Sequence, residues 1–452
     1  MSDETMLDAG VHAIAQAVCA GRVSAVSIAR AALERIATRD VRIQAVQTTF
    51  DARALEDARR IDEAVKAGRD PGPLAGVPFL VKSNFDVAGY TTVAGSPARL
   101  ALPEARADAA LVARLCAAGA VPVGATHMDE LACGATGINP YFGAVCLPAD
   151  PARMTGGSSS GSAAAVAAGY APLALGSDTN GSIRAPAALC GVWAVKPGNG
   201  RFDLRGCVPY APSLDAGGGF ARSFADLVAF YDALRGHASH DSRAPNDGPI
   251  HAPLRVAVLT GGFMQYANAD AWRAVQRAAA CFEHVAEVAI DEASLTSIRD
   301  AALTVSNYEL ARTHRLLLDV DSSLVSTRLR ERIVTGLSIA NAAYTQALAD
   351  REAWHSRLHT LFDSSDVLIA PATPCAAPRF ADATIDINGT ALDPTKSLGR
   401  HTQPISFAAL PVLSAPGHGM GELPVGVQLI GASGGEAACF AAGAQIARKS
   451  YR

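Results

Sequence analysis

Two glycine- and serine-rich segments, 156–162 and 176–184, carry residue types that can do covalent chemistry. They read Gly-Gly-Ser-Ser-Ser-Gly-Ser and Gly-Ser-Asp-Thr-Asn-Gly-Ser-Ile-Arg, and neither contains a histidine. A serine nucleophile here needs another base, because a hydroxyl attacks poorly until a base takes its proton. Lys82, which follows the apolar run 77–81, is the candidate base. The combination predicts amide-bond hydrolysis through a serine–serine–lysine relay.

Ser182 is the predicted nucleophile within the second segment. Backbone N–H groups of its loop are expected to converge on the oxyanion that forms when an amide carbonyl is attacked. These groups belong to Thr179, Asn180, Gly181 and Ser182. A helix beginning near Ile183 would add positive potential at the same place. An isolated Gly-Ser pair is more often a simple turn, so the prediction needs support from other motifs.

Lys82 has to lose its proton near neutral pH to act as a base. The pKa of a free lysine is about 10.4, so a shift of roughly three units, or about 4 kcal/mol, is required. Burial among the apolar residues of the run 77–81 is the right kind of cause, since it disfavours the charged form. A lone lysine is more often a surface residue.

Several further motifs, together with the two segments above, make the chain resemble the amidase signature family. They are Leu74-Ala-Gly-Val-Pro78 with Lys82, Cys190-Gly191, Lys196-Pro197 and Leu423-Pro-Val-Gly-Val-Gln-Leu-Ile-Gly431. The resemblance covers nearly the whole chain, and the paired serine motifs at this separation are its most specific part.

The resemblance implies a role for each residue of the relay. Lys82 is the base, Ser158 passes the proton, and Ser182 forms the acyl-enzyme. The peptide bond between Gly157 and Ser158 is expected to be cis. Three more residues are expected to support the two loops: Ser159, Asp178 and Arg184. The resemblance implies no cofactor and no metal.

Within that family the chain looks most like the 1-carboxybiuret hydrolase branch, which acts on a small urea-like compound and associates with a small helical subunit. Asn180 stands where most members have glycine, which favours a small polar substrate. Three segments depart from the usual pattern near the expected pocket: 134–139, 196–200 and 217–219. The substrate therefore stays open. The alternatives are an A-type subunit of a glutamyl-tRNA amidotransferase, a broad-specificity aliphatic or aryl amidase, and an inactive scaffold.

Two other motifs suggest different chemistry. Residues 157–161 match Gly-x-Ser-x-Gly, but an α/β-hydrolase elbow needs a preceding strand, and residues 150–155 are not expected to form one. His355 and His359 are four residues apart, yet residue 356 is serine where a zinc protease motif has glutamate. Neither motif outweighs the relay.

Composition excludes several classes of partner. The chain has 452 residues, 49% apolar and 18% charged, with a net charge of −4, so no basic surface for nucleic acid is expected. No apolar run reaches the ~18–20 residues of a membrane span. Nine scattered cysteines fit a reducing compartment, and a cytoplasmic location is expected. Self-association is left open.

Strand and helix patterns alternate, which favours an α/β class with a central mixed sheet covered by helices on both faces. Strands are predicted at 77–81, 121–125, 172–175, 254–259, 367–370 and 423–431. We expect one amidase domain over 1–452, with a helical segment at 1–70, the signature core at 71–235 and a helical insertion at 270–365. Residues 236–253 are expected to form a surface loop.

Overall fold

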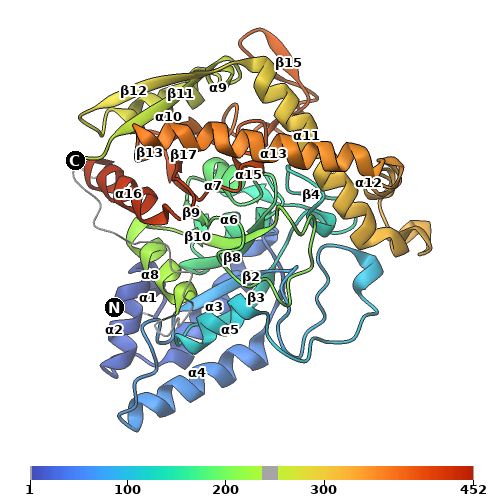
Figure 1. Cartoon of the computed structure of the whole chain (residues 1–452). Helices are drawn as coiled ribbons and strands as arrows, with labels where there is room; N and C mark the ends of the chain where they lie inside the picture. Colours follow the sequence, from blue (N-terminus) through green and yellow to red (C-terminus); the bar gives the residue numbers. More distant parts are fainter. Residues whose placement is uncertain (1–2, 237–252, 451–452) are drawn as a thin grey trace.

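A mixed sheet of 11 strands forms the centre of the molecule in the computed structural model, which describes residues 3–236 and 253–450 (Figure 1). Its order is β1-β3-β2-β8-β10-β9-β16-β17-β13-β11-β12. The strands are β1 Val46–Thr49, β2 Pro78–Lys82, β3 Val121–Thr126, β8 Leu173–Asp178, β9 Trp193–Lys196, β10 Ala216–Ala221, β11 Val256–Gly261, β12 Val285–Ile290, β13 Val367–Pro371, β16 Val412–Pro416 and β17 Gly426–Ile430. β2 runs parallel to β3 and β8, and β11 runs parallel to β12 and β13, whereas the other pairs are antiparallel.

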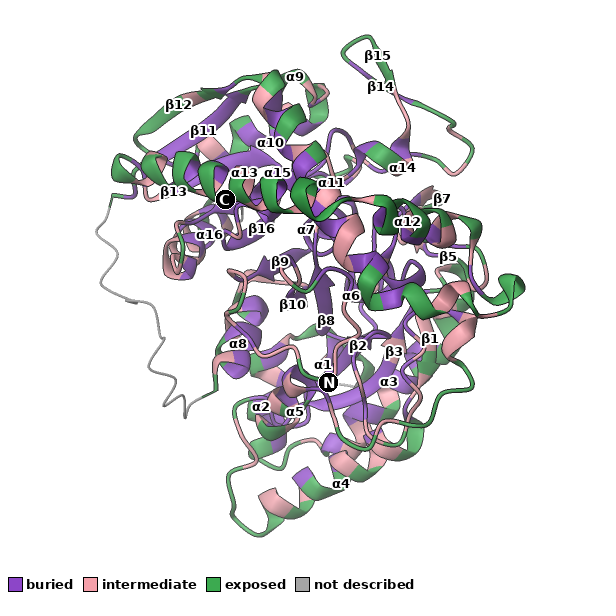
Figure 2. Cartoon of the chain, turned by 45° about the vertical axis from the view of Figure 1, so that its right-hand side comes forward, coloured by how far each residue is buried: buried purple, intermediate pink, exposed green. Residues whose placement is uncertain are grey.

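Helices cover both faces of this sheet. Successive residues of its central strands point to opposite faces and therefore into two different cores. In β13, Val367 and Ile369 belong to one apolar cluster, and Leu368 and Ala370 belong to the other. This double burial explains why these strands read as continuous apolar runs rather than as alternating patterns. Figure 2 shows the central strands buried and the edge strand β12 mostly exposed, with exposed residues on the outer sides of helices such as α4 and α13.

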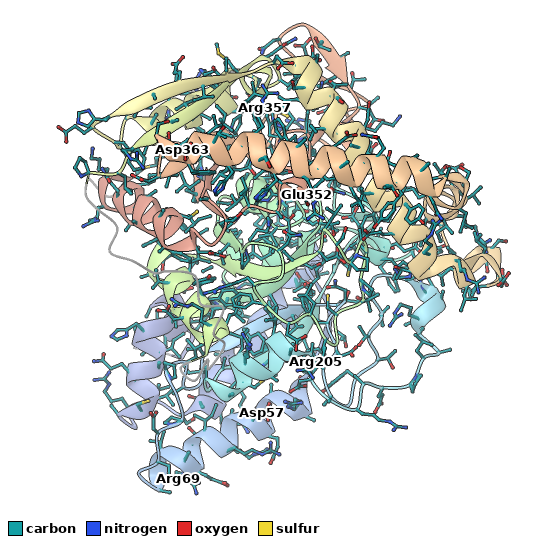
Figure 3. All side chains as sticks on the ribbon, viewed as in Figure 1. Asp57, Arg69, Arg205, Glu352, Arg357 and Asp363 are labelled. Atoms are coloured by element: carbon teal, nitrogen blue, oxygen red, sulfur yellow. The ribbon has the colours of Figure 1, made fainter. Side chains whose placement is uncertain are left out.

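The helices of the N-terminal part lie at the β1–β3–β2 end of the sheet, and α11 to α13 lie towards its other end (Figure 1). The longer helices are α2 Val11–Cys19, α3 Ala25–Arg39, α4 Asp51–Lys66, α5 Ala110–Ala117, α6 Ser160–Ala167, α8 Phe224–Arg235, α10 Ala269–Ala279, α11 Glu292–His314, α12 Thr327–Ser338, α13 Asn341–His359 and α16 Glu436–Ser450. The short ones are α1 Asp3–Asp8, α7 Arg184–Cys190, α9 Gly262–Gln265, α14 Pro394–Ser397 and α15 Gln403–Phe407. Acidic and basic side chains such as Asp57, Arg69, Glu352 and Arg357 occur at both ends of the molecule (Figure 3).

Three two-stranded hairpins lie outside the central sheet. They are β4 Ile138–Asn139 with β5 Gly143–Ala144, β6 Cys146–Leu147 with β7 Asp150–Met154, and β14 Ile385–Ile387 with β15 Thr390–Leu392. β7 corrects the prediction that residues 150–155 form no strand. It pairs with β6 and forms a single bridge with Arg379, both outside the central sheet, so it does not provide the sheet strand that an α/β-hydrolase elbow needs.

Two predicted helical stretches contain strands of the central sheet. β1 lies within residues 1–70 and pairs with β3, and β12 lies within residues 270–365 and pairs with β11. Ser24 caps α3, since its side chain accepts a hydrogen bond from the N–H of Ser27. The predicted loop 236–253 lies almost entirely outside the described residues. The division into three parts stays a prediction.

Candidate active site

Lys82 ends β2 in the interior of the protein and is fully buried. Its Nζ lies 2.8 Å from Ser158 Oγ and 2.9 Å from Ser177 Oγ, and 3.4 Å from the Ser177 carbonyl oxygen. Burial lowers the pKa of Lys82 to about 8, even though nearby negative groups act in the opposite direction. A much larger fraction of this amine than of a free lysine is therefore uncharged near neutral pH, as a general base requires.

Ser158 lies between β7 and α6, and its peptide bond with Gly157 is cis, as the sequence resemblance implies. Ser159 connects this loop to the loop of Ser182. Its backbone N–H donates to the Ser182 carbonyl at 3.1 Å, and its hydroxyl donates to the Ser177 carbonyl at 3.1 Å. The two glycine- and serine-rich segments are thus held side by side at Ser159.

The loop 179–182 joins the end of β8 to the start of α7, and Asp178 sets its shape. Asp178 Oδ1 accepts the N–H of Gly181 at 2.8 Å, and Oδ2 accepts the N–H of Ile183 at 3.0 Å. Gly181 has a φ of +126°, and a Cβ there would collide with the Thr402 side chain, so glycine is required. The N–H of Gly181 thus already donates to Asp178. Its predicted role as a donor to the oxyanion stays a prediction.

Arg184 forms a fully buried ion pair with Asp178, with Nη2 and Oδ1 3.0 Å apart. Burial alone would raise the pKa of the Asp178 carboxyl, but the Arg184 guanidinium holds this pKa well below its usual range. Arg184 also donates to the Thr402 carbonyl at 3.0 Å, to Gln428 Oε1 at 2.6 Å and to the Ser406 hydroxyl. The pair therefore ties the Ser182 loop to α15 and β17.

Asp215 is a partly buried carboxylate that the sequence analysis missed. It accepts the Thr179 hydroxyl at 2.5 Å and the N–H of Tyr210 at 2.8 Å. Burial raises the pKa of Asp215 to about 6. Asp215 thus anchors one end of the Ser182 loop, but it stands 33 residues further along the chain, with no spacing rule to point to it.

Ser177 and Asn84 were missed as well, although Ser177 directly precedes Asp178 and Asn84 lies two residues after Lys82. Asn84 Nδ2 donates to Ser177 Oγ at 3.1 Å. A neutral amine has two N–H groups and one lone pair. If its N–H groups are directed to the hydroxyl and carbonyl oxygens of Ser177, the lone pair of Lys82 faces the Ser158 hydroxyl.

A cavity of about 460 Å³ opens beside these loops. Gly157 and residues 179–182 form one wall, so Ser182 lines the cavity, and Ser182 is 8% exposed. The described residues offer the Ser182 hydroxyl no hydrogen bond. α11 and α12 also line the cavity, chiefly with basic side chains. A small molecule bound in this cavity can therefore reach the Ser182 hydroxyl.

Comparisons with known proteins agree with this geometry. The Amidase family pattern matches residues 27–440. The chain belongs to the amidase signature family. It is 40% identical over 446 residues to AtzE, a 1-carboxybiuret hydrolase subunit of Pseudomonas sp. strain ADP, covering 95% of this chain and 96% of the relative. It is 33% identical to the A-type subunit of the glutamyl-tRNA(Gln) amidotransferase of Carboxydothermus hydrogenoformans, covering 92% of each chain.

Solved structures show the same fold. A protein complex described as revealing the evolutionary origins of an s-triazine catabolic enzyme superposes with a TM-score of 0.91 and 38% identity, covering 98% of both chains. The peptide amidase of Stenotrophomonas maltophilia gives a TM-score of 0.82 and 26% identity, covering 98% of this chain and 97% of the other. The chain is therefore an amidase, an enzyme that hydrolyses amide C–N bonds.

Other kinds of site find no support in residues 3–236 and 253–450. No group of three His, Cys, Asp or Glu side chains there is arranged to hold a metal ion. His355 and His359 stack on each other on α13, and His355 Nδ1 lies 2.8 Å from the Ala408 carbonyl. No described helix has both the length and the hydrophobicity needed to cross a membrane.

Proposed function

We propose that this amidase acts through Ser182, Ser158 and Lys82. Neutral Lys82 takes the proton of Ser158 while Ser158 takes that of Ser182, whose oxygen attacks the amide carbonyl. The proton returns to the leaving nitrogen, and water then hydrolyses the acyl-enzyme by the same relay. The observation that carries the proposal is the 2.8 Å contact between the buried Lys82 amine and Ser158, next to a cavity lined by Ser182.

We assign the oxyanion site to the loop N–H groups around the nucleophile. Gly181 bonds to Asp178, so the N–H groups of Asn180 and Ser182 are the first candidates, with that of Thr179 beside them. Asp215 and Asp178 hold the loop from its two ends, so its donors are positioned before substrate arrives.

The proposed substrate is a small linear amide of the urea or biuret type, such as 1-carboxybiuret. The Asn180 and Asn307 side chains line the cavity, and their buried Oδ1 atoms have no hydrogen-bond partner within the described residues. A buried acceptor without a partner is costly, and a ligand rich in N–H groups would satisfy both. The 40% identical relative, which belongs to a 1-carboxybiuret hydrolase, supports the same substrate class.

The second candidate is an A-type subunit of a glutamyl-tRNA amidotransferase, which the 33% identical relatives favour. A broad-specificity amidase stays a third alternative. We also propose that the chain pairs with a small helical subunit, since its relative is named as one subunit of an enzyme, and its structural neighbour as part of a complex. The nine free cysteines favour the cytoplasm as its location.

Ammonia release from a panel of biuret-type, aliphatic and aryl amides tests the proposal. We expect the isolated chain to hydrolyse a biuret-type amide, Ser182→Ala to be inactive, and Lys82→Ala to be nearly so. Full activity in both variants would overturn the assignment of the relay. Ammonia transfer to an acceptor only when a tRNA-binding partner is added would favour the amidotransferase function instead.

A further inference from the structure

A second cavity, of about 370 Å³, lies beside β1, β3 and the end of β2. Its lining comes from β1 and β3, from residues within the segment 83–100 that follows β2, and from Phe142. Among the described residues, none lines both this second cavity and the active-site cavity. Its volume falls within the range of roughly 300–1,000 Å³ that is typical of small-molecule sites. The second cavity is therefore a separate space that can hold a small ligand.

Aromatic and aliphatic side chains form most of the wall of the second cavity. Four aromatic residues line it: Phe50, Phe85, Tyr90 and Phe142. The rings of Phe50 and Tyr90 have their centroids 4.3 Å apart. No described residue of this wall carries a charge, in contrast to the active-site cavity. Because a charged group would be desolvated here without a partner, the second cavity favours a neutral ligand.

Two polar side chains of the second cavity have no hydrogen-bond partner among the described residues. The Ser83 hydroxyl is buried and unpaired there, and the residue as a whole is 4% exposed. Gln47 Oε1 is buried and unpaired as well. A buried polar atom without a partner costs about 1–3 kcal/mol, and an amide oxygen can only accept a hydrogen bond. A ligand with an N–H group supplies the donor that these two oxygens lack.

The backbone holds Ser83 in place between β3 and the segment that follows β2. Its N–H donates to the Thr126 carbonyl at 3.2 Å, and its carbonyl accepts the N–H of Ala94 at 2.8 Å. The side chain of the preceding residue, Lys82, reaches Ser158, whereas Ser83 lines the second cavity. The Ser83 hydroxyl is thus fixed at this wall and takes no part in the relay.

We propose that the second cavity binds a neutral aromatic molecule that carries an N–H donor, such as an indole or an aniline. The aromatic side chains pack against its ring, and its N–H donates to the oxygen of Ser83 or of Gln47. Leu100, which lines the cavity and is 56% exposed, lies where the cavity meets solvent and would be covered by the ligand. The proposal is independent of the relay and of the substrate, because it uses other residues.

Isothermal titration calorimetry with indole tests the proposal in the wild-type chain, since indole contains no amide bond to be cleaved. We expect indole to bind with a Kd of about 1 mM or tighter. Benzofuran has the same shape without the N–H and should bind about 3- to 10-fold more weakly. The ammonium form of benzylamine should bind at least about tenfold more weakly than indole, because its charge is desolvated. No binding of indole, or equal binding of either comparison compound, would overturn the proposal.

Substitutions test which residues contact the ligand. Ser83→Ala should weaken indole binding about 3- to 10-fold and benzofuran binding less than about twofold. Leu100→Ala should weaken the binding of both about two- to fivefold, because it removes apolar contact area. Leu102→Ala is the matched control, since Leu102 is 43% exposed in the same segment but does not line the cavity, and it should change neither. Equal losses in the two leucine variants would contradict the proposal.

The position of the ligand can be measured directly in the unmodified protein. Crystals would be soaked with bromoindole, and the bromine located by its anomalous scattering. We expect a bromine peak between the aromatic side chains of the second cavity. A peak only in the active-site cavity, or no peak at either place, would overturn the proposal even if the substituted proteins fail to fold.

Discussion

Lys82 Nζ lies almost as close to Ser177 Oγ, at 2.9 Å, as to Ser158 Oγ, at 2.8 Å. Ser177 Oγ also accepts a hydrogen bond from Asn84 Nδ2 at 3.1 Å, so Lys82 and Asn84 both approach the same hydroxyl oxygen. We infer that Ser177 holds the amine so that its lone pair faces Ser158. Ser177→Ala is therefore expected to lower kcat about 10- to 100-fold with little change in KM, because proton transfer is misaligned while binding is not. Ser177→Thr keeps the hydroxyl and should retain most of the activity; an equal loss in both variants would contradict the role.

The pH profile of kcat/KM reports the state of Lys82. The base must be uncharged, and burial lowers its pKa to about 8. Activity should therefore rise about tenfold per pH unit below pH 8 and level off above it. Steady-state rates from pH 6 to 10 provide the measurement. If kcat/KM has already reached its plateau by pH 7, a group other than Lys82 controls the loss of activity at low pH.

Lys82 is expected to lower the free energy of unfolding, although activity requires it. Its pKa is about 10.4 when unfolded and about 8 when folded, so the folded state disfavours the charged amine by about 3 kcal/mol at pH 7. Lys82→Met should be inactive yet raise the free energy of unfolding by about 1–3 kcal/mol at pH 7. This gain should shrink as pH rises from 8 towards 10, where the unfolded lysine also loses its proton. Lys66→Met, an exposed control, should stay within about 0.5 kcal/mol.

Arg184 is expected to be essential for the fold of the active site. Its fully buried pair with Asp178 fixes the loop of Ser182 and reaches α15 and β17. Arg184→Met leaves the Asp178 carboxylate buried and unpaired, so we expect a loss of about 3–5 kcal/mol in urea denaturation. Arg255→Met removes an exposed pair with Asp366 and should cost at most about 1 kcal/mol. Similar losses in the two variants would contradict this role for Arg184.

The residues of the proposed relay could be picked out from the sequence because their signal is local. Ser158, Ser182 and Lys82 each lie in a short motif, and the apolar run before Lys82 already indicated its burial. Asp215 and Thr402 shape the same site through contacts across 36 and 222 residues of chain, which no spacing reveals. Arg299, Arg328 and Arg332, which line the cavity, were missed for the same reason, because α11 and α12 meet the Ser182 loop only in the folded protein.

Strands in the helical stretches were missed for a physical reason too. β1 reads Val-Gln-Thr-Thr, which has no apolar run, and it pairs at the sheet edge through its backbone. β12 forms the opposite edge and reads Val-Ala-Glu-Val-Ala-Ile, an apolar run too short to distinguish a strand from a helix. β13 and β17 were predicted well because they are buried on both faces. Burial alone does not decide which strands are predictable, because the buried strands β9, β10 and β16 were missed as well.

Covalent labelling of the nucleophile tests the account most directly. The protein would be treated with a fluorophosphonate, and the adduct located by mass spectrometry of its peptides. We predict a single adduct on Ser182 in the wild-type chain, none at this position in Ser182→Ala, and much slower labelling in Lys82→Ala. An adduct on a different serine, or labelling of Ser182→Ala at the wild-type rate, would contradict the proposed mechanism.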